Sequence, residues 1–279
     1  MLAHRPSLIA FVALMLWPAA ALAGPIDNWC EQLGKRLRSV SASACRIQNF
    51  VAARDITPKG NPLVFLDVAT ASRRERASSA RRILVVGGIH GDELTSTSTV
   101  FRWLNWIQHP DAAIHHWRVI PLANPDGLMA RPPTRVNSSG VDLNRNFQTP
   151  DWTRDAHAYW VKRTRRDPRR YPGKLAGSET ETLWLQTQVE EFRPDLIISV
   201  HAPYNLLDYD GPVPMPLRFG RLTLNQLGVY PGSMGNFFGL IKQIPLVTIE
   251  LPNATTMPSQ KDQQEMWRDM LEWIKNNKE

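Results

Sequence analysis

The chain of 279 residues is poor in cysteine, and it has no internal repeat and no Gly/Ser-rich linker. Its two cysteines, Cys30 and Cys45, have no histidine or third cysteine beside them, which makes them poor ligands for a structural metal. Beyond the first residues, no apolar run approaches the roughly 20 residues that a membrane-spanning helix needs. These absences favour one large domain, with no integral membrane segment in the mature chain.

The first residues, MLAHRPSLIAFVALMLWPAAALAG, have the pattern of a secretory signal peptide. A basic start at Arg5 leads into an apolar run over 8–17, and the small residues ALA precede Gly24. Pro18 breaks the apolar run, and no cysteine stands at the cut to carry a lipid anchor. We therefore expect residues 1–23 to be a cleaved signal peptide and the protein to be periplasmic or otherwise exported.

Export gives the two cysteines a structural role. In an oxidising compartment they most simply form one disulfide. A Cys30–Cys45 bond would close a loop of about 15 residues, worth on the order of 3 kcal/mol. It would lie in an N-terminal extension over 24–60, ahead of the main domain over 61–279. Three roles stay open for this extension: a scaffold element, a partial lid or a contact with the cell wall.

The charge balance is basic and is concentrated in two segments. The formal net charge is +7, and it becomes about +6 when Arg5 leaves with the signal peptide. The basic runs cover 72–82 and 161–170. Runs of this kind are most often solvated loops, and the alternative is contact with an anionic surface such as the cell wall. We expect no nucleic-acid partner, because no aromatic residues interleave with the basic ones.

Strand-like runs alternate with helical stretches along most of the chain. Short β-rich runs are followed by segments with helical periodicity or a helix-capping pattern, which predicts an α/β sandwich with a largely parallel sheet. The predicted strands cover 62–69, 82–88, 118–122, 195–200 and 244–250, and the predicted helices cover 93–108, 177–194 and 259–277.

Histidine and glutamate follow the ends of these predicted strands. His90 and Glu93 come directly after one strand, His201 after a second and Glu250 after a third. Ligands of parallel α/β sheets bind at the carboxyl ends of the strands, so these side chains are expected to meet. Two histidines and one carboxylate form a catalytic zinc set that leaves a position open for water. The second glutamate, Glu250, is then free to act as a general base.

Five sequence blocks now identify a family. GGIHGDE, NPDG, RVNSSGVDLNRNF, SVHAP and TIELP resemble, in that order, the signature blocks of the zinc metallocarboxypeptidases. The resemblance implies a catalytic domain over 61–279 with a mixed, mostly parallel, twisted eight-stranded sheet between helices. It also implies peptide hydrolysis with one zinc ion per chain. The ligands map to His90, Glu93 and His201, and the general base to Glu250.

The same resemblance assigns the substrate side. Asn144 and Arg145 map to the residues that hold the terminal carboxylate of the substrate, and Arg135 to the arginine that polarises the scissile carbonyl. The chemistry agrees, because a planar guanidinium can bind a carboxylate bidentately, and a fixed cation stabilises a developing oxyanion. The family often has a cis peptide bond at the position of Ala202–Pro203, so we expect that bond to be cis.

Some residues depart from the pattern of the digestive members, and these departures indicate which branch of the family the chain resembles. Digestive members have arginine where this chain has Asp92, whereas HGDE and YPGSMGNFFG are similar to the bacterial branch typified by murein peptide amidase A. That branch removes meso-diaminopimelate from the γ-D-glutamyl residue of cell-wall peptides. Two roles stay open for Asp92: it recognises a substrate ammonium, or it orients a zinc-binding histidine. Tyr230 is a candidate pocket residue, although Leu227 aligns nearer to the capping tyrosine of digestive members.

The sequence thus predicts an exported zinc carboxypeptidase or amidase that acts on murein peptides. The expected reaction is Glu-assisted attack of a zinc-bound water on the γ-D-glutamyl–meso-diaminopimelate bond. One alternative is a zinc deacylase of the aspartoacylase type. The NPDG and TIELP blocks, together with Arg135, favour peptide hydrolysis over this alternative. A second alternative is a carboxypeptidase that acts on other peptides. A third is a non-catalytic wall-binding module on an inactive peptidase scaffold. Such modules usually lack a metal ligand or the general base, whereas His90, Glu93, His201 and Glu250 are all present here.

Overall fold

The computed structural model describes residues 24–69, 80–212 and 214–277. The predicted signal peptide over 1–23 and most of the basic run over 72–82 lie outside these residues. Within the described part of the chain, no helix has both the length and the apolar character needed to cross a bilayer.

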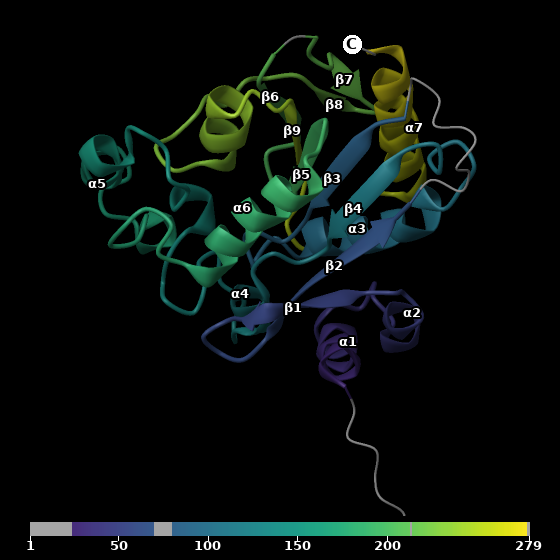
Figure 1. The fold of residues 1–279 in the computed structure, drawn as a ribbon, viewed down its shortest axis with the longest axis horizontal. Coiled ribbons are helices and arrows are strands. Elements are labelled where there is room, and N and C mark those ends of the chain that lie inside the picture. The colour runs from purple at the N-terminus through teal and green to yellow at the C-terminus, as the bar shows by residue number, and fades with distance from the viewer. Residues whose placement is uncertain (1–23, 70–79, 213, 278–279) are drawn as a thin grey trace, which may run out of the picture.

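The described residues form a seven-stranded sheet with the strand order β1-β2-β4-β3-β5-β9-β6 (Figure 1). The strands are β1 (Val51–Ile56), β2 (Pro62–Val68), β3 (Arg82–Val86), β4 (His116–Ile120), β5 (Leu196–His201), β6 (Leu206–Asp210) and β9 (Leu246–Glu250). The four central strands β4, β3, β5 and β9 run parallel, and β1, β2 and β6 pair antiparallel at the two sides. The predicted mixed α/β fold is confirmed, with the parallel part confined to the centre.

An eighth strand of this sheet is reduced to a single bridge in the described chain. Two short strands, β7 (Arg218–Phe219) and β8 (Leu222–Thr223), pair with each other in a separate ladder. Only Leu224 bridges to Leu207 on the sheet edge. Beyond that bridge, the backbone N–H of Leu227 donates to the Asp208 carboxylate at 3.1 Å rather than to a strand carbonyl. This side-chain contact ends the ladder, so the strand count is seven where the sequence predicts eight.

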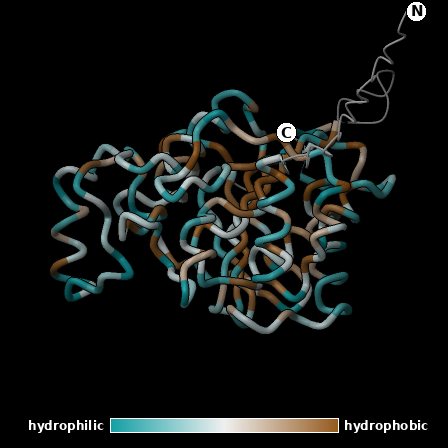
Figure 2. The backbone as a smooth tube through the Cα atoms, turned by 90° about the horizontal axis from the view of Figure 1, so that it is seen from below, coloured by the Kyte–Doolittle hydropathy of each residue, from teal (hydrophilic) through white to brown (hydrophobic). Residues whose placement is uncertain are grey.

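Helices cover both faces of the sheet. On β3, Ile83 and Val85 pack against α3 (Leu94–Ile107) and α7 (Gln260–Asn276), while Leu84 and Val86 face α6 (Thr180–Phe192). This alternation follows from the two-residue period of a strand, and it places one apolar core on each side of the sheet. Figure 2 shows the hydrophobic segments running through the middle of the molecule. The remaining elements are α1 (Pro25–Arg36), α2 (Ala42–Arg46), α4 (Pro125–Met129), η1 (Leu143–Arg145), α5 (Trp152–Lys162), η2 (Pro168–Arg170) and the π-helix η3 (Gly235–Ile241).

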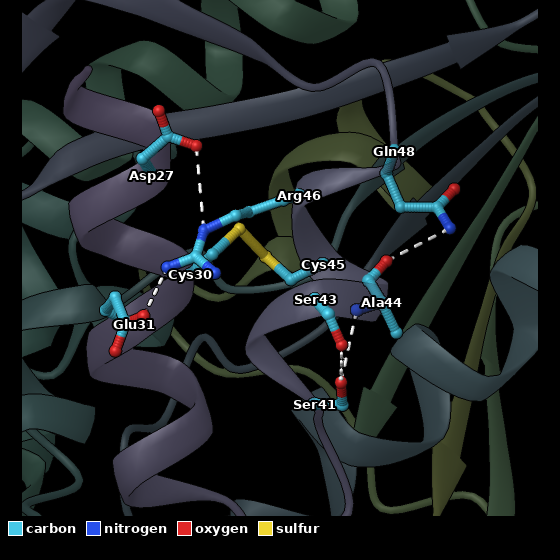
Figure 3. The surroundings of a disulfide bond; sticks show 9 residues. All are labelled: Asp27, Cys30, Glu31, Ser41, Ser43, Ala44, Cys45, Arg46 and Gln48. Atoms are coloured by element: carbon cyan, nitrogen blue, oxygen red, sulfur yellow. Dashed lines mark hydrogen bonds and ion pairs between the residues drawn. A yellow bond between two sulfur atoms is a disulfide. The ribbon is translucent and has the colours of Figure 1, made fainter. Parts of the chain in front are cut away.

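The predicted disulfide is confirmed and joins α1 to α2 (Figure 3). Cys30 and Cys45 are both fully buried. Beside the bond, Arg46 forms ion pairs with Asp27 and Glu31 of α1. The disulfide therefore lies at the packed interface of the two N-terminal helices.

The N-terminal segment is also attached to the body of the protein. Arg36, at the end of α1, donates hydrogen bonds to the carbonyl oxygens of Leu128 and Ala130, in and just after α4. The strand β1 then joins the sheet edge through antiparallel pairing with β2. Part of the segment over 24–60 therefore belongs to the sheet, and the predicted domain boundary at residue 60 stays a prediction.

Replacing Cys30 and Cys45 together by serine is expected to lower the free energy of unfolding by about 3 kcal/mol, because the open loop regains its conformational entropy in the unfolded state. Urea unfolding followed by tryptophan fluorescence measures this difference. The wild-type protein unfolded in the presence of a thiol reductant is the matched control and should show the same loss. Equal unfolding midpoints for the oxidised wild type and the double variant would contradict a stabilising role.

Candidate active site

The sheet brings the predicted metal-binding residues to one edge. His201 is the last residue of β5, and Glu250 is the last residue of the neighbouring β9, directly opposite it in the ladder. His90 and Glu93 lie in the turn between β3 and α3, and β3 pairs with β5 on its other side. The parallel arrangement therefore collects four side chains that are up to 160 residues apart at the carboxyl ends of three adjacent strands.

Three of these side chains form a compact set of donor atoms. Glu93 Oε1 lies 2.7 Å from His90 Nδ1, and Glu93 Oε2 lies 3.2 Å from His201 Nδ1. The two Nδ1 atoms are 3.2 Å apart, and all three residues are buried. The edge of a tetrahedron with metal–ligand bonds of 2.0–2.1 Å is about 3.3 Å, so the spacing of the nitrogens suits a zinc ion. A two-histidine, one-carboxylate set is also a typical donor set for that metal.

The charge state of Glu93 agrees with a ligand role. Burial acts to raise the pKa of this carboxyl, but the neighbouring His90 and His201 outweigh it and hold the pKa well below its usual range. Glu93 is therefore ionised, which is the form that binds a cation.

The outer nitrogens of both histidines are held by neighbouring side chains. His90 Nε2 lies 3.2 Å from Asp142 Oδ1, and His201 Nε2 lies 2.9 Å from the hydroxyl of Ser199. Such contacts fix the ring orientation and the tautomer of a metal-binding histidine. Asp142 lies in the DLNRNF block that the sequence singled out, but its role was missed. One local signal was available, since Asp142 also caps η1 by accepting from the Asn144 amide at 3.0 Å.

Asp92, for which the sequence left two roles open, points elsewhere. Its Oδ2 accepts a hydrogen bond from Arg169 Nη1 at 2.6 Å. Among the described residues it contacts no histidine, and the carboxylate beside the outer nitrogen of His90, Nε2, is that of Asp142. Arg169 belongs to the basic run over 161–170, so this run lies against the metal-binding turn, although most of its arginines are exposed.

A cavity of about 240 Å³ opens beside the histidines and contains most of the predicted substrate residues. Its lining includes His90, Arg135, Asn144, Arg145, His201, Tyr230 and Glu250, and Asp92 is outside it. Arg170 of the basic run also lines this cavity, which the sequence did not predict.

Two arginines in this cavity have different environments. Arg135 donates to Asp142 Oδ2 at 2.9 Å and lies 3.4 Å from Glu93 Oε1, so its charge is compensated. Arg145 is buried, and its guanidinium lies 4.3 Å from the centre of the Tyr230 ring. Within the described residues, Arg145 forms no ion pair and its Nε has no hydrogen-bond partner. A buried cation without a counter-ion is costly, so this position is suited to an anionic ligand.

Glu250 is buried and lines the same cavity. Its Oε2 is 3.4 Å from the backbone nitrogen of Tyr204, which is a weak contact. Burial raises the pKa of Glu250, although His201 counteracts the shift. A carboxylate with a raised pKa is a better proton acceptor near neutral pH. The predicted cis bond between Ala202 and Pro203 follows His201 directly and is present.

The fold and site together define a metal-dependent peptide hydrolase of the carboxypeptidase class. Residues 43–210 match the family described as zinc carboxypeptidase, which is well over half of the chain. The chain therefore belongs to the zinc carboxypeptidase family, whose members depend on zinc.

Among the relatives of this chain are bacterial proteins named murein peptide amidase A. The chain is 34% identical to that of Escherichia coli K12 over 146 residues, which cover 52% of this chain and 55% of the relative. It is 32% identical to that of Vibrio campbellii over 184 residues, covering 63% and 72% respectively. The match thus spans about half the length of the Escherichia coli protein.

Solved structures show the same fold. The murein-tripeptide amidase MpaA from Escherichia coli O157 superposes with a TM-score of 0.54 at 23% identity, covering 79% of this chain and 89% of that one. Carboxypeptidase A from Helicoverpa armigera gives a TM-score of 0.59 at 17% identity, covering 91% and 72%.

Replacing Asp142 by asparagine is expected to weaken zinc binding by about 10- to 100-fold, because an orienting carboxylate is lost from His90. Competition with a chromogenic chelator measures the zinc dissociation constant. Asp92→Asn is the matched control, since it removes a carboxylate from the same region without touching a histidine, and its zinc affinity should stay within about threefold of the wild type. Wild-type affinity in a folded Asp142→Asn variant would contradict the assignment.

Proposed function

We propose that this protein is an exported zinc-dependent carboxypeptidase or amidase that hydrolyses murein peptides at the γ-D-glutamyl–meso-diaminopimelate bond. The observation that carries the proposal is the shared cavity: a buried His–Glu–His donor set lies in the same site as Arg145, a buried arginine without a counter-ion. Such a pair suits a substrate with a free carboxylate next to the bond that is broken. The relatives named murein peptide amidase A support the choice of substrate.

One zinc ion per chain would be held by His90, Glu93 and His201. When bound, it supplies Lewis-acid chemistry, which polarises a carbonyl oxygen and lowers the pKa of water. The other steps, which are substrate binding, proton transfer and stabilisation of the oxyanion, depend on side chains that line the cavity.

Arg145 and Asn144 bind the terminal carboxylate of the substrate. The Asn144 side-chain oxygen accepts from the Met234 amide at 2.8 Å, and in this orientation the side-chain nitrogen is the group that would donate to the carboxylate. Arg145 adds a planar cation that can bind a carboxylate bidentately. Held in this way, a chain presents the bond before its last residue, so the enzyme releases one terminal residue at a time.

Glu250 takes a proton from the attacking water and returns it to the leaving nitrogen. Its raised pKa suits both steps, because the group must accept a proton and then donate it. Arg135, held by Asp142 and Glu93, places a fixed positive charge beside the carbonyl oxygen as negative charge develops there.

Incubating the zinc-loaded protein with L-Ala-γ-D-Glu-meso-diaminopimelate is expected to release free diaminopimelate. A chelator should abolish release, and added zinc should restore it. Glu250→Gln should keep bound zinc and lose about 10²- to 10⁴-fold in kcat, which is the usual contribution of general acid–base catalysis. Amino-acid analysis measures the product. The exposed Glu272→Gln on α7 is the matched control and should keep full activity.

Two results would overturn parts of this proposal. Release of a terminal residue from other peptides, but not from this tripeptide, would keep the chemistry and remove the murein assignment. No release from any peptide by a zinc-loaded protein, together with cleavage of N-acyl amino acids, would replace it by a deacylase function.

Export is the remaining part of the proposal, supported by the sequence of residues 1–23 and by the Cys30–Cys45 disulfide. The protein expressed in full in a Gram-negative host is expected in the periplasmic fraction with Gly24 as its first residue. N-terminal sequencing and intact mass measure the cut. A protein that stays in the cytoplasm with residues 1–23 attached would contradict export.

A further inference from the structure

The cavity has a floor made from one face of three neighbouring strands. Ser199 on β5 pairs with Thr248 on β9, and Thr248 in turn pairs with Asp208 on β6. All three residues line the cavity, as does Asp210, two positions further along β6. Because side chains alternate along a strand, Asp208 and Asp210 point to the same face.

These two carboxylates lie away from the metal-binding end. In the register of β6 with β9, Leu206 is opposite Glu250, and Asp208 and Asp210 follow two and four residues later. At about 3.3 Å per residue, they are about 7 and 13 Å along the strand from the level of Glu250. The cavity therefore extends along the strand from Glu250 toward these two carboxylates, and Asp208 is the nearer of the two.

Neither carboxylate forms an ion pair with a lysine or arginine of the described chain. Asp208 accepts hydrogen bonds from the backbone amides of Tyr209 and Leu227 at 2.9 and 3.1 Å. The Asp210 side chain has no hydrogen bond and no ion pair with any residue that the structure describes, although its backbone is part of the ladder with β9. Both side chains are buried, at 5% and 9% exposure. Burial, with the adjacent Asp208 adding to it, raises the pKa of Asp210 to about 7, which is the response of an acid without a cation beside it.

The neighbouring π-helix η3 leaves room for Asp210. A Cβ atom at Gly235 would collide with Asp210 Oδ2, and one at Gly239 would come within 2.5 Å of the Asp210 Cβ. Glycine at these two positions lets the η3 backbone pass close to the Asp210 side chain. The acidic end of the cavity is therefore shaped by both the strand and the helix beside it.

The cavity is thus acidic at one end and basic at the other. Arg135, Arg145 and Arg170 line the part next to the metal-binding residues, and the two aspartates line the far part of the floor. Asp92, the carboxylate that the sequence offered for an ammonium group, is already paired with Arg169 outside the cavity.

We propose that Asp208 and Asp210 form a subsite that binds an ammonium group on the side chain of the substrate's terminal residue. The inference rests on the proposed function for the position of the terminal carboxylate at Arg145. It selects residues with a long side chain that carries an ammonium at its far end, such as lysine or diaminopimelate, whose distal carbon also bears a carboxylate, over residues of the same length without that ammonium.

Product binding tests the subsite separately from catalysis. Calorimetry compares the zinc-loaded protein binding free meso-diaminopimelate and 2-aminopimelate, which lacks only the distal amino group. The wild type is expected to bind diaminopimelate about 10- to 100-fold more tightly, as is usual for a charged hydrogen bond. Asp210→Asn and Asp208→Asn should each remove most of this preference and leave 2-aminopimelate binding within about threefold.

Turnover provides the second readout. Peptides ending in lysine or norleucine differ by one ammonium group, and the wild type should prefer lysine in kcat/KM mainly through KM. Equal affinity of the wild type for both amino acids, or an unchanged preference in both folded variants, would overturn the subsite. If the preference for diaminopimelate were lost in Asp92→Asn and kept in the Asp208 and Asp210 variants, Asp92 and not this subsite would bind the ammonium. Failure of the murein reaction alone, with the diaminopimelate preference intact, would overturn the proposed function and leave the subsite.

Discussion

The buried carboxylate of Asp142 is the contact on which the geometry of the site depends. It has no exposed surface, and it holds His90 through one oxygen and Arg135 through the other. Burial acts to raise its pKa, but the charge of Arg135 and the contact with His90 outweigh burial and keep the pKa well below the usual range. One anion thereby fixes a histidine of the candidate metal site and an arginine of the neighbouring cavity with respect to each other.

The sheet supplies the rest of the geometry. Parallel pairing of β3, β5 and β9 ends three strands at one edge, where side chains distant in sequence can meet. The antiparallel partner β6 then runs back along β9, so its side chains lie progressively further from Glu250. The central strands therefore position the candidate metal and catalytic residues, and the edge strand β6 positions the residues of the proposed ammonium subsite.

Much of this arrangement was predictable from the sequence, because it follows from local rules. The histidines and glutamates directly follow apolar runs, and their meeting requires only that those runs be neighbouring strands. The disulfide needed only two cysteines and an oxidising compartment. The choice between Asp92 and Asp142 was not predictable, because it depends on the path of the loop between α4 and η1. Asp208 and Asp210 in LLDYDG gave no signal either, since alternating acids in a short strand usually face water.

The attachment of α1 bears on how much of the chain makes up the working unit. Arg36 binds the carbonyls of Leu128 and Ala130, and the α4 backbone at Gly127 packs so closely against Gly91 that a side chain there would collide with it. Gly91 is the neighbour of His90. The helix α1, which the disulfide joins to α2, therefore contacts α4, and α4 in turn packs against the turn that carries His90. A shortened protein that begins at residue 61 would retain every metal-binding and cavity residue and still lose the support behind them.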